Sequence, residues 1–118
     1  CLGTKDLKEL VRIIEVLQPS FSAFNIEDIE SPKCFYLMEE LEKRKIAAFH
    51  DDQQGTGIIV FAGLINALKV MKKDLKTVRI CLAGAGAAGY GVFKILREAG
   101  LKNLIVLDVK GIIYRNRK

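Results

Sequence analysis

Residues 78–89 read VRICLAGAGAAG, an apolar strand-like run that leads directly into a glycine-rich turn. Ala87 to Ala99 then carries apolar residues at helical spacing, and Gly100 stands where a helix C-cap is expected. Leu104 to Leu107 forms a further strand-like run that ends at Asp108. Strand, turn, helix and strand in this order predict a βαβ unit, in which the strands lie parallel in one sheet.

The glycines of the turn have the G-x-G-x-x-G spacing of a dinucleotide-binding motif. Gly84 would permit the tight turn, Gly86 the close approach of the backbone to a pyrophosphate, and Gly89 the packing of the helix against the strand. Amides at the helix start and the helix dipole favour a bound phosphate. A tight turn in an unrelated α/β protein is the alternative, but the strand before and the helix after favour dinucleotide binding. The residues predicted to bind the cofactor here are Gly84, Ala85, Gly86, Ala87, Ala88 and Gly89.

Asp108 completes the predicted cofactor site. It ends the second strand, about 20 residues beyond the turn, where a carboxylate binds the hydroxyl groups of the adenosine ribose. A carboxylate at this position repels a 2′-phosphate, which favours NAD over NADP. Lys110 lies close by in the sequence and could accommodate that phosphate. The predicted cofactor is therefore NAD, or NADP.

Helices and strands also alternate before the glycine turn. Thr4 is predicted to cap the first helix, and Ser31 to cap the second, with Pro32 at its first helical position. The third helix is almost wholly apolar and is predicted to be buried. The pattern predicts an α/β fold, a parallel sheet with flanking helices that contains an incomplete Rossmann-type dinucleotide-binding unit. These predicted helices cover residues 4–17, 33–45 and 55–71, and the predicted strands before the turn cover 20–26 and 46–49.

Two acid pairs, Glu27-Asp28 and Asp51-Asp52, each follow a predicted strand. Ligand groups gather at the carboxyl ends of parallel strands, so these acids and the glycine turn are expected to share a site. Clustered carboxylates suit a hard divalent cation such as Mg²⁺ or Mn²⁺. The spacing alone supports an alternative equally well, namely that the acids cap the segments that follow them.

The composition fits a globular core of ordinary size. With 118 residues, 50% hydrophobic content and a net charge of +5, the chain is not disordered, and its apolar runs are too short to span a membrane. The basic residues are spread over several segments, and only Lys110 to Lys118 is locally basic, which disfavours nucleic-acid binding. The 3 cysteines lack zinc-site spacing and no signal-peptide pattern is visible, which indicates a reducing, cytoplasmic location.

Taken together, the motifs resemble those of malic enzymes, most closely the prokaryotic-type members. Each motif alone is unspecific, whereas the combination is specific and covers nearly the whole chain. The segments that carry the resemblance are Asn25–Ile29, Pro32–Phe35, His50–Thr56, Gly84–Gly89 and Asp108–Tyr114.

The resemblance implies a reaction and a set of site residues. Malic enzymes oxidise L-malate with NAD⁺ or NADP⁺ and decarboxylate the product to pyruvate and CO₂, using Mg²⁺ or Mn²⁺. By this resemblance, Glu27, Asp28 and Asp52 would be metal ligands, and Asp51 would hold the catalytic base by a hydrogen bond. Ala85 to Ala88 would supply the backbone that contacts the cofactor phosphates. The full enzyme is expected to be a homo-oligomer.

The resemblance also implies that the chain is the central part of a longer enzyme. Residues 1–50 would be the C-terminal part of the active-site domain, and residues 51–118 the start of the NAD(P)-binding Rossmann domain. The general-acid tyrosine and general-base lysine of the family lie upstream of the aligned stretch, so the isolated chain is expected to be inactive. A malolactic or oxaloacetate-decarboxylating relative and a non-catalytic nucleotide-binding module are the alternatives.

Overall fold

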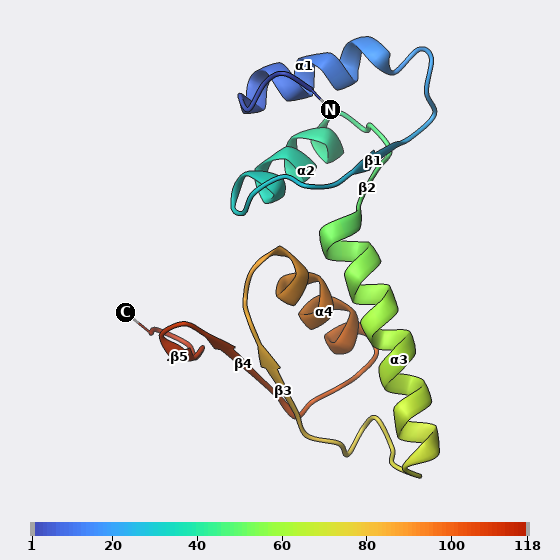
Figure 1. Ribbon diagram of the computed structural model, residues 1–118, viewed down its shortest axis with the longest axis vertical. Helices are drawn as coiled ribbons and strands as arrows, with labels where there is room; N and C mark the ends of the chain where they lie inside the picture. The colour runs from blue at the N-terminus through green and yellow to red at the C-terminus, as the bar shows by residue number, and fades with distance from the viewer. Residues whose placement is uncertain (1, 118) are drawn as a thin grey trace. The chain divides into compact units, whose positions relative to one another are not determined.

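A computed structural model describes residues 2–117. The chain divides into two compact units, an N-terminal unit that ends at Asp51 and a C-terminal unit that begins at Asp52 (Figure 1). The elements follow one another in the order α1 (Leu7–Leu17), β1 (Phe24–Ile26), α2 (Lys33–Lys43), β2 (Ala48–His50), the π-helical turn η1 (Asp51–Gly55), α3 (Thr56–Val70), β3 (Ile80–Ala83), α4 (Ala87–Glu98), β4 (Leu104–Asp108) and β5 (Gly111–Ile112).

In the N-terminal unit, two helices pack with a short parallel pair of strands. β1 and β2 align Phe24 with Ala48 and Ile26 with His50. The apolar residues of α1 recur at helical spacing, so one stripe of that helix faces the core. The buried core of the unit consists of Leu10, Val11, Ile14, Ile26, Leu37, Leu41 and Ile46.

The helix starts in this unit differ from the predicted caps. Asp6, not Thr4, is the N-cap of α1, because its Oδ1 accepts a hydrogen bond from the backbone N–H of Glu9 at 2.9 Å. The Thr4 hydroxyl instead accepts from the backbone N–H of Asp6 at 3.1 Å. Pro32, not Ser31, is the N-cap of α2, and it makes no side-chain cap. The prediction of Ser31 was wrong, because Ser31 and Pro32 both belong to a turn that precedes the helix, in which the backbone N–H of Cys34 donates to the carbonyl of Glu30 at 3.1 Å.

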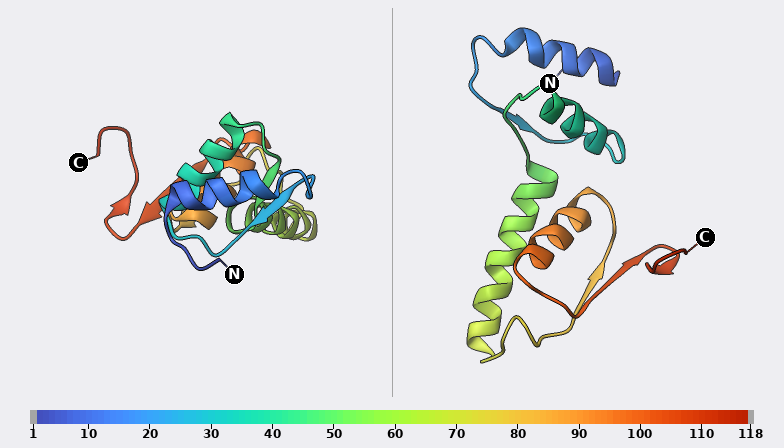
Figure 2. Two further views of the ribbon diagram at one scale, coloured as in Figure 1. Left: turned by 90° about the horizontal axis from the view of Figure 1, so that it is seen from above. Right: turned by 180° about the vertical axis from the view of Figure 1, so that it is seen from behind.

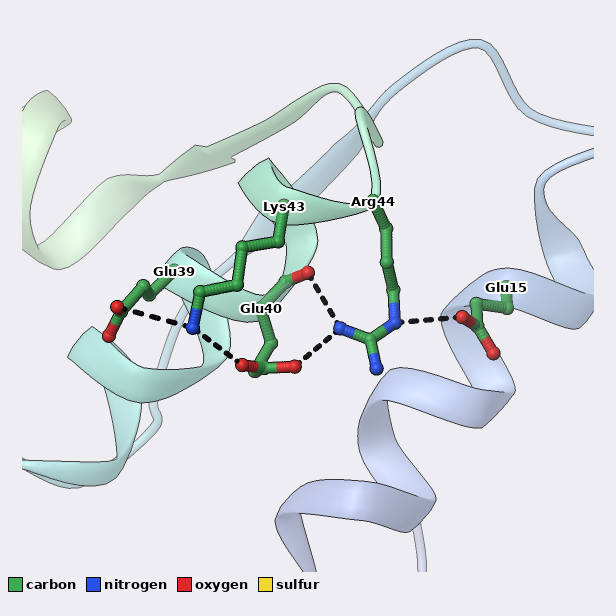
Figure 3. Close-up of polar contacts among 5 residues, drawn as sticks. All are labelled: Glu15, Glu39, Glu40, Lys43 and Arg44. Atoms are coloured by element: carbon green, nitrogen blue, oxygen red, sulfur yellow. Dashed lines mark hydrogen bonds and ion pairs between the residues drawn. The ribbon is translucent and has the colours of Figure 1, made fainter.

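A surface network joins α1 to α2 (Figure 3). Arg44 Nε donates to Glu15 Oε1 at 2.9 Å, and the same guanidinium pairs with Glu40. Lys43 reaches Glu40 at 2.9 Å and Glu39 at 3.3 Å. Hydrogen bonds from Arg44 and then Lys43 hold the pKa of Glu40 below its ordinary value. Because these pairs are exposed to solvent, they contribute little to the stability of the fold.

The C-terminal unit contains the sheet β3-β4-β5. β3 and β4 are parallel, with Ile80 opposite Leu104 and Ala83 opposite Leu107. β5 is antiparallel to β4 and was not predicted. α4 connects β3 to β4. α3 packs against α4, as Figure 1 and the right-hand view of Figure 2 show. The C-terminal unit has its own hydrophobic core, whose buried residues are Val92, Leu96 and Leu101.

These elements confirm the predicted fold class, since parallel strands are flanked by helices in both units. The strands belong to two separate sheets. Gly100 follows α4 with φ +90°, and its N–H donates to the carbonyl of Arg97 at 3.0 Å. The C-cap of α4 is Ala99, one residue before the predicted Gly100, and the left-handed Gly100 follows the cap and prevents the helix from continuing.

The prediction that the third helix is buried was wrong. Ile59 is 72% exposed and Val70 84% exposed, and only Gly57 and Leu68 of α3 are buried. The physical reason is that α4 is the element that packs most extensively on α3, so it covers one face. Between residues 2 and 117, no helix combines the length and apolar character needed to cross a membrane.

Candidate functional site

The glycine turn begins directly at the carboxyl end of β3. Gly84 has φ +112°, a backbone conformation that favours glycine over any residue with a Cβ atom. Its N–H donates to the carbonyl of Leu107 at 2.8 Å, which extends the pairing of β3 with β4 by one residue. The chain therefore leaves the sheet at this point and turns sharply into α4.

Gly89 allows α4 to approach the strand end. A Cβ atom at Gly89 would lie 2.0 Å from the carbonyl oxygen of Gly84, a separation that real side chains do not tolerate. The close packing predicted for Gly89 is thus a backbone-to-backbone contact across the turn. Any larger residue would push the helix start away from the sheet.

Gly86 faces open space at the start of α4. It is the N-cap of the helix and has no side-chain cap, and a Cβ atom there would meet nothing within 4 Å. The first N–H groups of a helix have no acceptor within the helix, so they can bind an anion. The space above Gly86 together with these amides forms a backbone cradle of the kind that a pyrophosphate would fill.

A second close approach was not predicted. A Cβ atom at Gly91 would lie 2.0 Å from the carbonyl oxygen of Gln53, and one at Gly57 would lie 3.0 Å from the carbonyl oxygen of Gly91. The turn η1, α3 and α4 therefore pack backbone against backbone. The sequence feature that could have predicted these contacts is the presence of Gly57 and Gly91 within helical patterns. A glycine inside a helix costs about 1 kcal/mol relative to alanine, so its presence there suggests that another element packs closely against it.

Asp108 ends β4 beside the turn, as predicted, but it is engaged in an ion pair. Its Oδ1 accepts from the backbone N–H of Lys110 at 2.8 Å and from Nη1 of Arg117 at 2.9 Å, while its Oδ2 pairs with Nη2 of Arg117. Hydrogen bonding from Arg117 lowers the pKa of Asp108 to about 2. Sequence reasoning missed Arg117. Gly111, at φ +102°, was the signal for the hairpin that returns the chain toward Asp108.

The acid pairs occupy strand ends in the N-terminal unit. Glu27 and Asp28 follow β1 and Asp51 follows β2, and the last residues of these strands are aligned with each other. Asp28 has φ +58°, an uncommon conformation for a residue with a side chain. Glu27 Oε2 accepts a hydrogen bond from Asn25 Nδ2 at 3.2 Å. Glu27, Asp28 and Asp51 thus share one edge of the β1-β2 pair.

The three predicted metal ligands belong to two units, because Asp52 begins the C-terminal unit. Neither unit, over residues 2–117, gathers three or more His, Cys, Asp or Glu side chains that could hold a metal ion. Glu27 and Asp28 line a groove of about 570 Å³ in the N-terminal unit, together with apolar residues of α1 such as Leu10 and Ile14. Their oxygen atoms are of the type that Mg²⁺ and Mn²⁺ prefer. The ligand set remains a prediction.

A strand, a glycine turn, a helix and a parallel strand that ends in an aspartate define a dinucleotide-binding unit of the Rossmann type. Residues 53–118 match the family described as "Malic enzyme, NAD binding domain". The chain belongs to the malic enzyme family.

Individual relatives agree with this assignment. The chain is 44% identical to the NAD-dependent malic enzyme of Geobacillus stearothermophilus, over 98% of this chain and 24% of that protein. It is 42% identical to the bifunctional malic/malolactic enzyme of Bacillus subtilis, over 98% of this chain and 28% of that protein. The crystal structure of the NAD-dependent malic enzyme of Thermotoga maritima superposes with a TM-score of 0.91 at 42% identity, covering 98% of this chain and 31% of that one.

The comparisons confirm the predicted family and its dinucleotide cofactor class. The chain is a segment of the NAD-binding region of malic enzymes and spans 24% to 28% of the length of the curated relatives just described. These relatives and others include proteins named as NAD-dependent and as NADP-dependent.

Proposed function

We propose that this chain supplies the dinucleotide-binding turn and part of the metal and substrate site of an enzyme that oxidises L-malate with NAD or NADP, forming pyruvate and CO₂. The observation that carries the proposal is the open backbone cradle at Gly86. It lies beside the left-handed Gly84 and at the start of α4, where a phosphate group is stabilised by amides and by the helix dipole.

In this proposal, the cofactor is held mainly by backbone. The residues from Ala85 to Ala88 bind the pyrophosphate, and Asp108 accepts hydrogen bonds from the adenosine ribose. Gly84 and Gly89 keep the turn close to the sheet, which fixes the position of the phosphate. When bound, the nicotinamide supplies the hydride acceptor for the redox step.

The carboxylates have a separate proposed role. Glu27, Asp28 and Asp52 would hold Mg²⁺ or Mn²⁺, and Asp51 would position the catalytic base by a hydrogen bond. When bound, the cation acts as a Lewis acid toward the substrate oxygens. Support for this assignment comes from the family membership and from the shared strand edge that carries Glu27, Asp28 and Asp51. It places residues 1–50 in the active-site domain and residues 51–118 in the cofactor domain.

Several finer expectations accompany the proposal. The isolated chain is expected to be inactive, since the general-acid tyrosine and general-base lysine of the family are not assigned to any residue in it. The full enzyme is expected to be a cytoplasmic homo-oligomer, with free thiols at Cys34 and Cys81 in keeping with a reducing compartment. A malolactic outcome is the second candidate, because one relative at 42% identity is a bifunctional malic/malolactic enzyme.

The test adds a single methyl group to the cradle. Gly86 has φ −78° and open space around its Cβ position, so Gly86→Ala should fold normally. The methyl would occupy the position of the pyrophosphate, and the affinity for ADP-ribose, measured by calorimetry, should fall at least about tenfold, or 1.4 kcal/mol. Gly63→Ala is the matched control, since Gly63 on α3 also has nothing within 4 Å. Unchanged binding by Gly86→Ala would contradict the proposed site.

A further inference from the structure

We propose that Gly91 is a positioning residue that joins the cofactor helix α4 to the turn carrying Asp52, so that binding of a dinucleotide at the glycine turn is transmitted to this acid. The inference rests on the proposed function, since it concerns how two parts of the same site are held relative to each other. Neither Gly91 nor its contact partner Gln53 belongs to the G-x-G-x-x-G motif or to the predicted metal ligands.

The start of α4 is held on two opposite sides. A Cβ atom at Gly89 would lie 2.0 Å from the carbonyl oxygen of Gly84, and one at Gly91 would lie 2.0 Å from the carbonyl oxygen of Gln53. Because an α-helix has 3.6 residues per turn, positions 89 and 91 lie about 200° apart around the helix axis. The first turns of α4, which supply the proposed phosphate-binding amides, are therefore fixed by the strand end on one side and by η1 on the other.

The contact with η1 involves main chain on both sides. A Cβ atom at Gly91 would also lie 2.5 Å from the carbonyl carbon and 2.8 Å from the Cα atom of Gln53. Gln53 directly follows Asp52 in the chain. The Nε2 atom of Gln53 is buried and has no hydrogen-bond partner within residues 2–117, so packing on Gly91, and not a hydrogen bond from this amide, sets the place of the residue.

Two further features mark η1 as a specialised connection. It is a π-helical turn, a conformation that is rare and occurs mostly at functional sites. α3 continues from it, and Gly57 on α3 repeats the close approach, since a Cβ atom there would lie 3.0 Å from the carbonyl oxygen of Gly91. Glycine lowers the intrinsic stability of a helix, so the two glycines weaken α3 and α4 and at the same time permit this contact.

A contact of this kind transmits displacement directly. No side chain lies between the two main chains, so no rotamer change can absorb a movement of α4. A dinucleotide that orders the start of α4 should therefore also order η1, and with it Asp52, because binding energy that restrains one of two rigidly joined segments restrains the other.

The experiment measures backbone-amide hydrogen exchange by NMR on the whole chain, with and without ADP-ribose. Each variant receives free ADP-ribose at about 100 times its own Kd, so that a change in affinity does not alter the comparison. At this concentration, an opening that requires release of the ligand slows about a hundredfold. In the wild-type chain, the amides of η1 should slow by about the same factor as those in the first turns of α4.

Substitutions between the helices should separate the two responses. Gly57→Ala requires its neighbour to give by only a few tenths of an ångström, so this variant should fold. It should keep the slowing in α4 near a hundredfold and reduce the slowing in η1 to less than about tenfold. Gly91→Ala introduces a larger wedge and should abolish the slowing in η1. Gly63→Ala is the matched control, since it adds the same methyl group to α3 with nothing within 4 Å, and it should behave like the wild type.

The outcomes distinguish this inference from the proposed function. If ADP-ribose slows exchange in α4 but not in η1 of the wild type, or slows both equally in Gly57→Ala, the Gly91 contact is only structural and the inference is overturned while the cofactor site stands. If Gly91→Ala does not fold, Gly57→Ala alone decides. Failure of the wild-type chain to bind ADP-ribose would overturn the proposed function, and the inference with it.

Discussion

The two units hold their candidate groups by different means. In the C-terminal unit, the glycine turn is shaped by backbone contacts alone, with Gly84 at φ +112° and no room for a side chain at Gly89. In the N-terminal unit, Glu27, Asp28 and Asp51 project from the ends of short strands that rest on an apolar core. The first arrangement depends on the absence of side chains, and the second depends on their presence.

Because of this difference, we expect substitutions to disrupt the two sites in different ways. A backbone turn is lost abruptly when one atom is added, whereas a set of carboxylates loses its function when charge is removed and its geometry when the supporting core is weakened. The turn is also complete within one unit, while the predicted metal ligands come from segments of both. Substitutions in each region therefore test whether the two sites depend on different features of the chain.

The largest effect should come from Gly89→Ala. Because the added Cβ atom would lie 2.0 Å from the Gly84 carbonyl oxygen, α4 must move away from β3. We expect a loss of more than about 4 kcal/mol in unfolding free energy, or failure of the C-terminal unit to fold, measured by urea denaturation and by amide NMR spectra. Gly86→Ala adds the same methyl in open space and should cost less than about 1 kcal/mol. Similar stabilities for the two variants would refute the backbone-contact account.

The next effect concerns the core beneath the acid pairs. Leu37 of α2 is fully buried, at 0% exposure, so Leu37→Ala should cost about 2–5 kcal/mol and lower the melting temperature. Leu17→Ala is the control, since Leu17 is 39% exposed. Circular dichroism melts of the two variants provide the measurement. Equal melting temperatures would mean that the core of the N-terminal unit is not closely packed around Leu37.

A smaller effect is expected at the carboxylates themselves. Asp52→Asn removes one predicted ligand charge and should lower Mn²⁺ affinity about tenfold, equivalent to 1.4 kcal/mol, with little change in stability. Calorimetric titration with Mn²⁺ would measure it. Glu39→Gln removes an equal charge from an exposed position on α2 and should leave Mn²⁺ binding intact. If Asp52→Asn binds Mn²⁺ like the wild type, the interpretation of Asp52 as a helix-start acid would replace the ligand assignment.

The smallest effect is a shift in titration. The pKa of Asp108 is about 2 in the folded chain because Arg117 donates hydrogen bonds to it, compared with an ordinary value of 3.8. Since the folded value is the lower one, the stabilisation is fully present above the ordinary value and is lost as the pH falls through about 2.

Carboxyl NMR titration would follow Asp108 directly. Arg117→Gln should raise its midpoint toward 3.8, and Arg115→Gln should leave it near 2. A wild-type midpoint at the ordinary value would contradict the ion pair.

The local features of the chain were predictable from the sequence. The βαβ order, the glycine turn and the end of α4 just before Gly100 depend on neighbouring residues, so their pattern was sufficient. The cap of α1 was ambiguous because Thr4 and Asp6 both favour helix starts, and only the hydrogen bond to Glu9 N–H distinguishes them.

The features that the sequence did not predict depend on contacts between distant residues. The approach of Gly91 to Gln53 and the pairing of Arg117 with Asp108 join positions that no local pattern connects. The exposure of α3 is also non-local, because the apolar sequence of a helix does not say which neighbours cover it. Side-chain sites that draw on several segments are consequently the part of the molecule that sequence patterns describe least.

The left-handed backbone of Asp28 has a consequence for how this position can evolve. At φ +58°, glycine and asparagine are the replacements that the main chain tolerates most readily, and both are a single base change away from an aspartate codon. Neither carries a charge. Among the single-base changes, those that the main chain tolerates best at this position therefore preserve the fold while removing the carboxylate, so retention of aspartate in a lineage would reflect selection for its charge.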